Sequence, residues 1–261
     1  MSEKDRVRQE VRRTYGSIAT SGVPGCGCTP SGCSPQPVSA KDLTAKLGYS
    51  SEEMGAVPEG SNMGLGCGNP QAIARLKRGE NVLDLGAGGG IDCFLAARQV
   101  GEEGLVIGVD MTPEMINKAR ENVVKANFHN VEFRLGEIEH LPVPDNSVDV
   151  IISNCVINLS PDKPQVFREA YRVLRAGGRL AISDIVAVRE LPEDIKKDIA
   201  KYTGCVSGAA SRDALVSMLE EVGFLRIEVE LKEESRAIIR EWFPGTGIEE
   251  YVVSASIEAT K

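Results

Sequence analysis

A cluster of four glycines directly after a short apolar segment constrains this chain more than any other feature. Residues 82–91 have the sequence VLDLGAGGGI, and an amphipathic segment continues to residue 98. A strand, a turn of bare backbone and a helix form the first half of a βαβ unit, with the turn facing the helix N-terminus. The cluster therefore predicts a site for a nucleotide-type cofactor.

Strand-like and helix-like segments alternate after the cluster, which calls for a parallel sheet with helices on both faces. After a helix expected over residues 211–222, two strand-like segments separated by an irregular segment predict a terminal antiparallel pair. The fold class is therefore α/β, a doubly wound and mostly parallel sheet of seven strands. The expected strands are residues 81–85, 105–110, 131–135, 148–153, 179–183, 224–231 and 250–259.

The N-terminal segment differs in composition from the rest of the chain. Apolar residues at helical spacing predict a helix over residues 3–15, which we interpret as a lid or cap, and residues 20–37 are rich in Gly, Pro, Ser and Cys, as in a loop. We divide the chain into an N-terminal helix and loop, residues 1–38, and a main domain, residues 39–261. That domain is expected to carry insertions beside the acceptor site, near residues 186–210 and 232–247.

Composition excludes some classes of function. The net charge of -8 leaves no basic stripe for nucleic acid, so we expect no nucleic-acid partner and a small-molecule substrate. The first residues, MSEKDR, are charged where a secretory signal is apolar, and no apolar run approaches membrane-spanning length. These features predict a cytoplasmic protein without membrane association. Its seven cysteines are then expected to be mostly thiols.

The spacing of the glycines argues against a dinucleotide. That fingerprint needs a glycine three positions after Gly88, where this chain has Ile91. The pattern that begins at Asp84 and continues through Gly86 and Gly88 instead suits a cofactor whose amino-acid portion and sulfonium lie against the turn. Asp110 lies twenty residues after Gly90, at the end of a strand, where an acid accepts hydrogen bonds from both ribose hydroxyls.

Further positions complete the expected cofactor site. Glu137 follows the third strand, where it can accept a hydrogen bond from the adenine amino group, and Ile138 can pack on the ring. We also assign Met111 and Asn154 to this site. Together with the Gly177-Gly178 turn and the last two strands, these features resemble the class I S-adenosylmethionine-dependent methyltransferases. The resemblance covers residues 70–260 and implies S-adenosylmethionine as the cofactor.

The acceptor site is expected beyond the fourth strand. Methyltransferases of nucleobase or amide nitrogens carry Asn/Asp-Pro-Pro-aromatic there, but residues 153–159 are SNCVINL, with Cys155 beside the expected methyl group. Cys205 and Cys67 lie in two other glycine-flanked loops. Three thiols arriving from separate loops could converge on one soft centre, and trivalent arsenic takes three thiolates in a pyramid.

Three segments, LGCGNP, NCVINL and GCVSGA, are similar to segments of the arsenite methyltransferases. This resemblance implies that Cys67, Cys155 and Cys205 bind As(III), and that the products are methylated arsenicals, as in arsenic detoxification. It also implies that a thiol reductant, glutathione or thioredoxin, regenerates the enzyme. The family usually has a further functional cysteine near the N-terminus, a role that stays open among Cys26, Cys28 and Cys33.

The expected mechanism needs no general base, because thiolate-bound arsenic attacks the methyl group with a lone pair that carries no proton. Both histidines, His129 and His140, are accordingly expected at the surface, and Cys93 in the core. Two other functions remain open: a C- or O-methyltransferase of a quinone-like molecule, and a non-catalytic thiol-rich protein that binds metalloids. Zinc is disfavoured for the N-terminal cysteines because their Cys-x-Cys-x₄-Cys spacing has no matched second pair.

Overall fold

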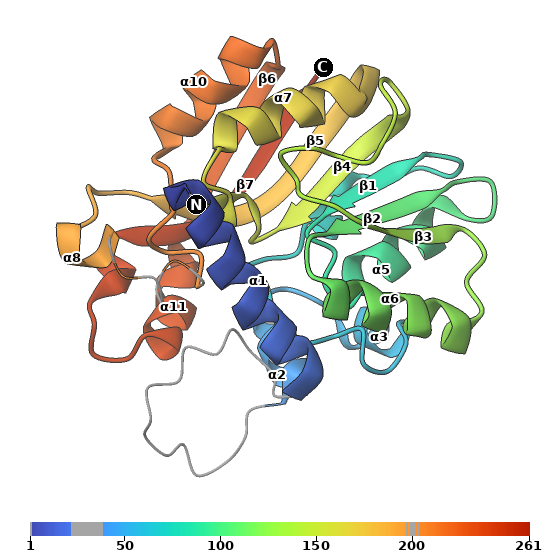
Figure 1. Cartoon of the computed structure of the whole chain (residues 1–261), viewed down its shortest axis with the longest axis horizontal. Coiled ribbons are helices and arrows are strands. Elements are labelled where there is room, and N and C mark those ends of the chain that lie inside the picture. The colour runs from blue at the N-terminus through green and yellow to red at the C-terminus, as the bar shows by residue number, and fades with distance from the viewer. Residues whose placement is uncertain (1, 22–38, 197, 199–201, 203) are drawn as a thin grey trace.

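A seven-stranded sheet forms the centre of the computed structural model, which describes residues 2–21, 39–196, 198, 202 and 204–261 (Figure 1). The strand order is β3-β2-β1-β4-β5-β7-β6. The strands are β1 (Val82–Leu85), β2 (Val106–Asp110), β3 (Val131–Leu135), β4 (Val148–Asn154), β5 (Leu174–Ala187), β6 (Leu225–Lys232) and β7 (Val252–Thr260).

Helices connect the strands and extend the chain at its N-terminus. The α-helices are α1 (Glu3–Ser21), α2 (Ala40–Lys46), α3 (Ser51–Gly55), α4 (Gln71–Ala74), α5 (Ile91–Val100), α6 (Pro113–Ala126), α7 (Lys163–Val173), α8 (Glu193–Lys196), α10 (Arg212–Val222) and α11 (Arg236–Trp242). Short 3₁₀ turns are η1 (Ile157–Leu159), η2 (Glu233–Ser235) and η3 (Ile248–Glu250).

Strand directions confirm the predicted fold class. The strands β1 to β5 pair in parallel, whereas β7 pairs antiparallel with both β5 and β6. The last two strands are thus an antiparallel pair, as predicted. Because β7 lies between β5 and β6, the final strand of the chain is interior to the sheet.

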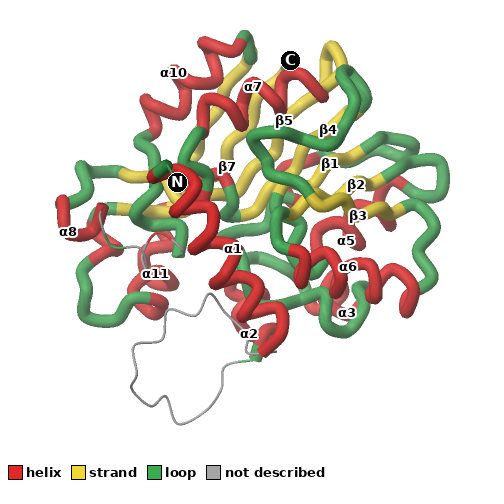
Figure 2. The backbone as a smooth tube through the Cα atoms, in the orientation of Figure 1, coloured by secondary structure: helices red, strands yellow, loops and turns green. Residues whose placement is uncertain are grey.

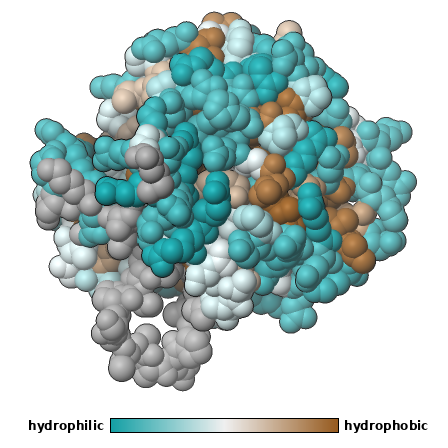
Figure 3. Space-filling model, in the orientation of Figure 1, coloured by the Kyte–Doolittle hydropathy of each residue, from teal (hydrophilic) through white to brown (hydrophobic). Residues whose placement is uncertain are grey.

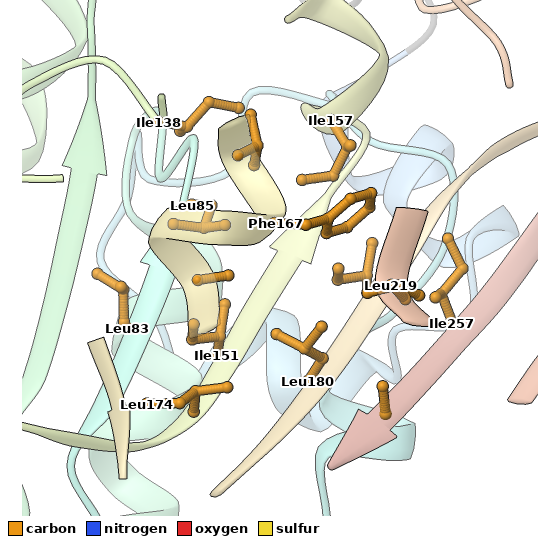
Figure 4. Close-up of a cluster of buried hydrophobic side chains, with 14 of the residues drawn as sticks. Leu83, Leu85, Ile138, Ile151, Ile157, Phe167, Leu174, Leu180, Leu219 and Ile257 are labelled. Atoms are coloured by element: carbon orange, nitrogen blue, oxygen red, sulfur yellow. The ribbon is translucent and has the colours of Figure 1, made fainter. Parts of the chain in front are cut away.

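Alternating side chains of β1 explain why helices cover both faces of the sheet. Leu83 and Leu85 pack in one cluster with Phe167 of α7 and with α10, as Figure 4 shows. Val82 points to the opposite face, where it packs with α5, α6 and α4. The sheet therefore separates two hydrophobic cores, which is the doubly wound arrangement.

Two elements near the C-terminus differ from the sequence prediction. Strand β5 is longer than residues 179–183 at both ends. Leu174 pairs with Val148 ahead of an irregularity that contains Gly177, whose φ is +78°, and residues 184–187 pair with β7. The segment between β6 and β7 is not merely irregular, since α11 forms there. Ile239 and Phe243 of this region are buried, and that burial stabilises the short helix.

Helix α1 crosses in front of the sheet, and α6 is its main helical neighbour (Figures 1 and 2). It contains the helix predicted over residues 3–15 and continues to Ser21, so the loop predicted from residue 20 begins later. The remainder of that loop, with Cys26, Cys28 and Cys33, lies outside the described residues.

The face of the molecule shown in Figure 3 is largely hydrophilic, including the outer side of α1, and hydrophobic residues occur on it only in small groups. Among the described residues, no helix combines the length and the apolar character needed to cross a membrane. Both predicted surface histidines, His129 and His140, are exposed.

Candidate active site

A cavity enclosing about 1020 Å³, part of it open to solvent, lies where the carboxyl ends of β1, β2 and β4 meet α1. This is the edge at which open parallel sheets bind ligands. Most of the predicted cofactor residues line the cavity: Asp84, Gly86, Gly88, Asp110, Met111, Ile138 and Asn154.

The glycine turn is shaped by close packing on one side and by the cavity on the other. A Cβ at Gly86, whose φ is +71°, would lie 2.4 Å from Cγ2 of Val156. A side chain there would displace the loop after β4. A Cβ at Gly88 would meet nothing within 4 Å, because the backbone of this residue borders the cavity.

Two buried carboxylates face the cavity, Asp84 and Asp92. The thiol of Cys93 donates to Asp84, and the hydroxyl of Tyr49 donates to Asp92 at 2.8 Å. Burial, reinforced by the charge of Asp92, raises the pKa of Asp84 well above its usual value, and burial raises the pKa of Asp92 to about 6. Among the described residues no Lys or Arg forms an ion pair with either, so the pair suits a cationic ligand.

Asp110 lies at the end of β2 as predicted. One of its oxygens accepts from the backbone N–H of Gly88 at 3.0 Å, and the other accepts from Thr112 at 2.8 Å. Each carboxylate oxygen has two lone pairs, so both can accept a further bond from a ribose hydroxyl. Burial raises the pKa of Asp110.

Glu137, expected from the sequence beside the adenine, has its side chain engaged by helix α1. It forms an ion pair with Arg12 at 3.1 Å and a longer one with Arg8, both on α1. Of the described residues in this segment, Ile138 and Glu139 line the cavity but Glu137 does not. The side chain of Glu139 is buried against Arg8 at 3.1 Å and Ser160 at 2.7 Å. These two acids therefore hold α1 over the cavity.

Asn154 lines the cavity, but its side chain is bound to the protein. Its Oδ1 accepts from the backbone N–H of Cys67 at 2.9 Å, and its Nδ2 donates to the Gly68 carbonyl at 2.7 Å and to the Tyr49 hydroxyl at 3.0 Å. Asn154 thus connects the Cys67 loop to the residue that holds Asp92.

The three predicted thiols belong to a single apolar cluster, and of the three only Cys155 lines the cavity. Cys67 and Cys155 lie with their sulfurs within 4.8 Å of each other. The Cys205 thiol donates to the Cys155 carbonyl at 2.8 Å. Burial raises the pKa of Cys67 to about 11 and that of Cys155 well above its usual value, so both thiols are protonated at neutral pH.

Backbone conformation brings these loops together. A Cβ at Gly66, whose φ is +120°, would lie 2.7 Å from Nδ2 of Asn154, so only glycine allows the Cys67 loop to approach β4 this closely. Cys155 and Cys205 have φ values of +58° and +64°, a region that non-glycine residues rarely adopt. Such strain persists only where the surrounding structure imposes it, and it is concentrated at functional sites.

Sequence reasoning missed three residues of this site. Asp184 of β5 lies beside the thiols, and Tyr49 and Asp92 form the pair behind the glycine turn. A carboxylate at the end of an apolar strand was the available signal for Asp184. No sequence signal pointed to Tyr49, because its partner Asp92 is 43 positions away in the sequence. Cys93 is buried in the core as predicted and lies outside the thiol cluster.

Comparisons with known proteins agree with this arrangement. A family model described as a methyltransferase domain matches residues 76–223. An arsenite methyltransferase of Halobacterium salinarum is 51% identical over 99% of this chain and 68% of its own length. A second arsenite methyltransferase, from Aquipseudomonas alcaligenes, is 46% identical over 58% of this chain. The matched segment covers 45% of that protein.

A solved structure, that of an arsenic(III) S-adenosylmethionine methyltransferase from Chlamydomonas reinhardtii, is also similar. It superposes with a TM-score of 0.61 at 34% sequence identity. The match covers 86% of this chain and 74% of the other.

Proposed function

The chain belongs to the arsenite methyltransferase family, and we propose that it transfers a methyl group from S-adenosylmethionine to As(III) bound by Cys67, Cys155 and Cys205. One observation carries this proposal. Cys155 belongs both to the thiol cluster and to the lining of the cavity behind the glycine turn. A metalloid held by the thiols would therefore face whatever occupies the cavity.

The cavity suits the cofactor that the methyltransferase fold uses. When bound, S-adenosylmethionine supplies a methyl group on a positively charged sulfur. Asp84 and Asp92 provide buried negative charge for its cationic portion, and Asp110 provides acceptors for the ribose. Met111 and Ile138 offer apolar surface for the adenine ring.

The thiols bind arsenite by a balanced exchange. As each As–S bond forms, the thiol proton leaves with an arsenite hydroxide as water, so no external base is needed even though Cys67 is protonated at neutral pH. Arsenic held in this way keeps its lone pair. The contribution of the protein is then to aim that lone pair at the methyl carbon, and positioning of this kind can lower a barrier by roughly 7–11 kcal/mol.

We also propose the conditions under which the enzyme works. Cys67, Cys93 and Cys155 are free thiols, which fits a reducing compartment, the cytoplasm, with glutathione or thioredoxin as the regenerating reductant. Helix α1 acts as a lid on the main domain, residues 39–261, and α8 and α11 belong to the two acceptor-site insertions. This proposal is supported by the common cluster that Ile195 and Ile239 of those insertions form with the thiols.

The decisive experiment incubates the purified protein with S-adenosylmethionine, arsenite and a thiol reductant, followed by arsenic speciation. We expect methylated arsenicals from the unaltered protein and none from Cys155→Ser or Cys205→Ser. Undiminished methylation in either variant would contradict the three-thiolate site. As(III) binding without consumption of S-adenosylmethionine would identify a metalloid-binding protein instead. Methylation of a quinone that persists in both variants would identify the other alternative.

A further inference from the structure

The thiol cluster contains an oxygen donor as well as sulfur. A carboxylate oxygen of Asp184 and the sulfurs of Cys67 and Cys155 all lie within 4.8 Å of one another. Asp184 is only 2% exposed, on the strand next to the one that carries Cys155 into the cluster. The proposed methyl transfer uses thiolates and leaves this buried carboxylate without a role.

Neighbouring groups fix Asp184 and leave one of its oxygens largely available. Its Oδ1 accepts from the Asn158 side chain at 2.9 Å and from the backbone N–H of Ile185 at 2.7 Å. Its Oδ2 accepts a longer bond from the backbone N–H of Asn158 at 3.3 Å, and the backbone N–H of Ile157 also interacts with the carboxylate. Outer hydrogen bonds of this kind orient carboxylates that bind metal ions.

The charges around the cluster decide which ion it suits. Lys163, itself largely withdrawn from solvent, interacts electrostatically with Asp184 and Cys205. The thiolates of Cys67 and Cys155 and the carboxylate of Asp184 carry three negative charges, which a divalent cation and the Lys163 ammonium would balance. Three thiolates around As(III) form a neutral unit instead, so that Asp184 and Lys163 balance each other.

We propose that Cys67, Cys155 and Asp184 form a second kind of site, for a thiophilic divalent cation such as Zn²⁺ or Cd²⁺, which overlaps the As(III) site. Tetrahedral zinc with sulfur and oxygen ligands requires ligand atoms about 3.5–3.8 Å apart. Because the three donor atoms lie within 4.8 Å of one another, each pair needs to close by about 1.3 Å at most. As each bond to the cation forms, the thiol releases its proton to solvent. The two sites share Cys67 and Cys155 and differ in the third ligand, which is Cys205 for As(III) and Asp184 for the divalent cation.

Direct titration of the purified full-length protein with Zn²⁺ or Cd²⁺ alone tests this proposal. Calorimetry gives the affinity, and for Cd²⁺ the thiolate charge-transfer absorbance gives an independent signature of sulfur ligation. We expect Asp184→Asn to weaken cation binding at least tenfold and to change As(III) binding less than threefold. We expect Cys205→Ser to do the reverse.

Opposite responses of the two variants distinguish the loss of one site from the loss of the fold, because each variant is expected to keep binding either As(III) or the divalent cation. Only the As(III) measurements rest on the proposed function. If arsenic binding fails in the unaltered protein while Asp184-dependent cation binding persists, the proposed function falls and the cation site stands. Cation affinity that is unchanged in Asp184→Asn overturns the inference.

The N-terminal cysteines need a control, since they could bind the same cations. A full-length variant with Cys26, Cys28 and Cys33 replaced by serine is expected to keep the Asp184-dependent site and its affinity. Loss of all cation binding in this variant would place the ion in the N-terminal segment and overturn the proposal. In the unaltered enzyme, Zn²⁺ is expected to inhibit arsenite methylation competitively with arsenite.

Discussion

At the scale of single residues, Cys155 and Cys205 each combine a thiol of the cluster with a left-handed backbone conformation. For a residue other than glycine this conformation costs roughly 1–2 kcal/mol. The fold imposes this conformation on two residues that are neighbours in space, because the Cys205 thiol donates to the Cys155 carbonyl. The glycine-rich sequence around the thiols predicted only flexible loops. The observed strain instead indicates thiols that are held in place by the fold.

Asp92 makes the stability of the protein depend on pH. Burial raises the pKa of this carboxyl from 3.8 to about 6 in the folded state. Between these two values the folded state holds more protons than the unfolded state, so stability falls as pH rises from about 4 to about 6. The groups facing Asp92 are Tyr49, Gln71, Asn154, Glu53 and Asp84.

Asp92→Asn is therefore expected to remove a pH-dependent loss of stability of about 3 kcal/mol. Denaturant unfolding of both proteins without cofactor, at pH values from 4 to 7, measures the effect. The stability of Asp92→Asn relative to the unaltered protein should rise across that range. A difference that stays constant with pH would show that Asp92 is ionised throughout in the folded state.

At the scale of elements, α1 is held over the cavity by ion pairs that also protect buried charge. The side chain of Arg8 is 17% exposed and that of its partner Glu139 only 4%. Breaking this pair leaves a buried carboxylate with less compensation, a loss of about 1.5–3 kcal/mol for a hydrogen bond to a charged group. We expect Arg8→Gln to loosen α1 and to accelerate dissociation of S-adenosylmethionine at least tenfold.

Stopped-flow measurement of cofactor dissociation tests this expectation, and the chain offers a matched control. Arg13 also lies on α1, but its ion-pair partner Glu10 is on the same helix and its side chain is 74% exposed. Arg13→Gln should therefore leave the dissociation rate unchanged. Equal effects of the two substitutions would mean that α1 is not held by its contacts to Glu139.

The elements themselves were largely predictable, because each is encoded by nearby residues. The periodicity of residues 3–15, the glycine turn and the alternation of strands and helices all act over a few positions. Prediction was weakest where distant contacts decide. Strand β5 begins before Gly177 because Leu174 pairs with β4, and it continues past residue 183 because β7 pairs with it. Helix α11 forms because its apolar residues pack in the cluster of the thiols.

At the scale of the whole molecule, the cofactor half and the acceptor half of the site differed in how much of each could be predicted from the sequence. The proposed cofactor half lies around one turn and two strand ends, so spacing alone was enough to place Asp84 and Asp110 together, and both line the cavity. The acceptor half gathers Cys67, Cys155 and Cys205 from three loops, and resemblance rather than spacing supplied their common role. The ion pairs of Glu137 could not be predicted, because its arginine partners lie 125 and more positions earlier, on α1.

Asn154 joins these two halves through one side chain, which contacts the Cys67 loop and the Tyr49 hydroxyl that holds Asp92. A ligand that moves the Cys67 loop or the Tyr49 hydroxyl therefore changes the site at which the other ligand binds. We therefore expect cooperativity between cofactor and arsenite, and thermodynamic linkage requires that each alter the affinity of the other by the same factor. We expect calorimetric titrations in both orders to give one common factor in the unaltered protein, and a factor near unity in Asn154→Ala.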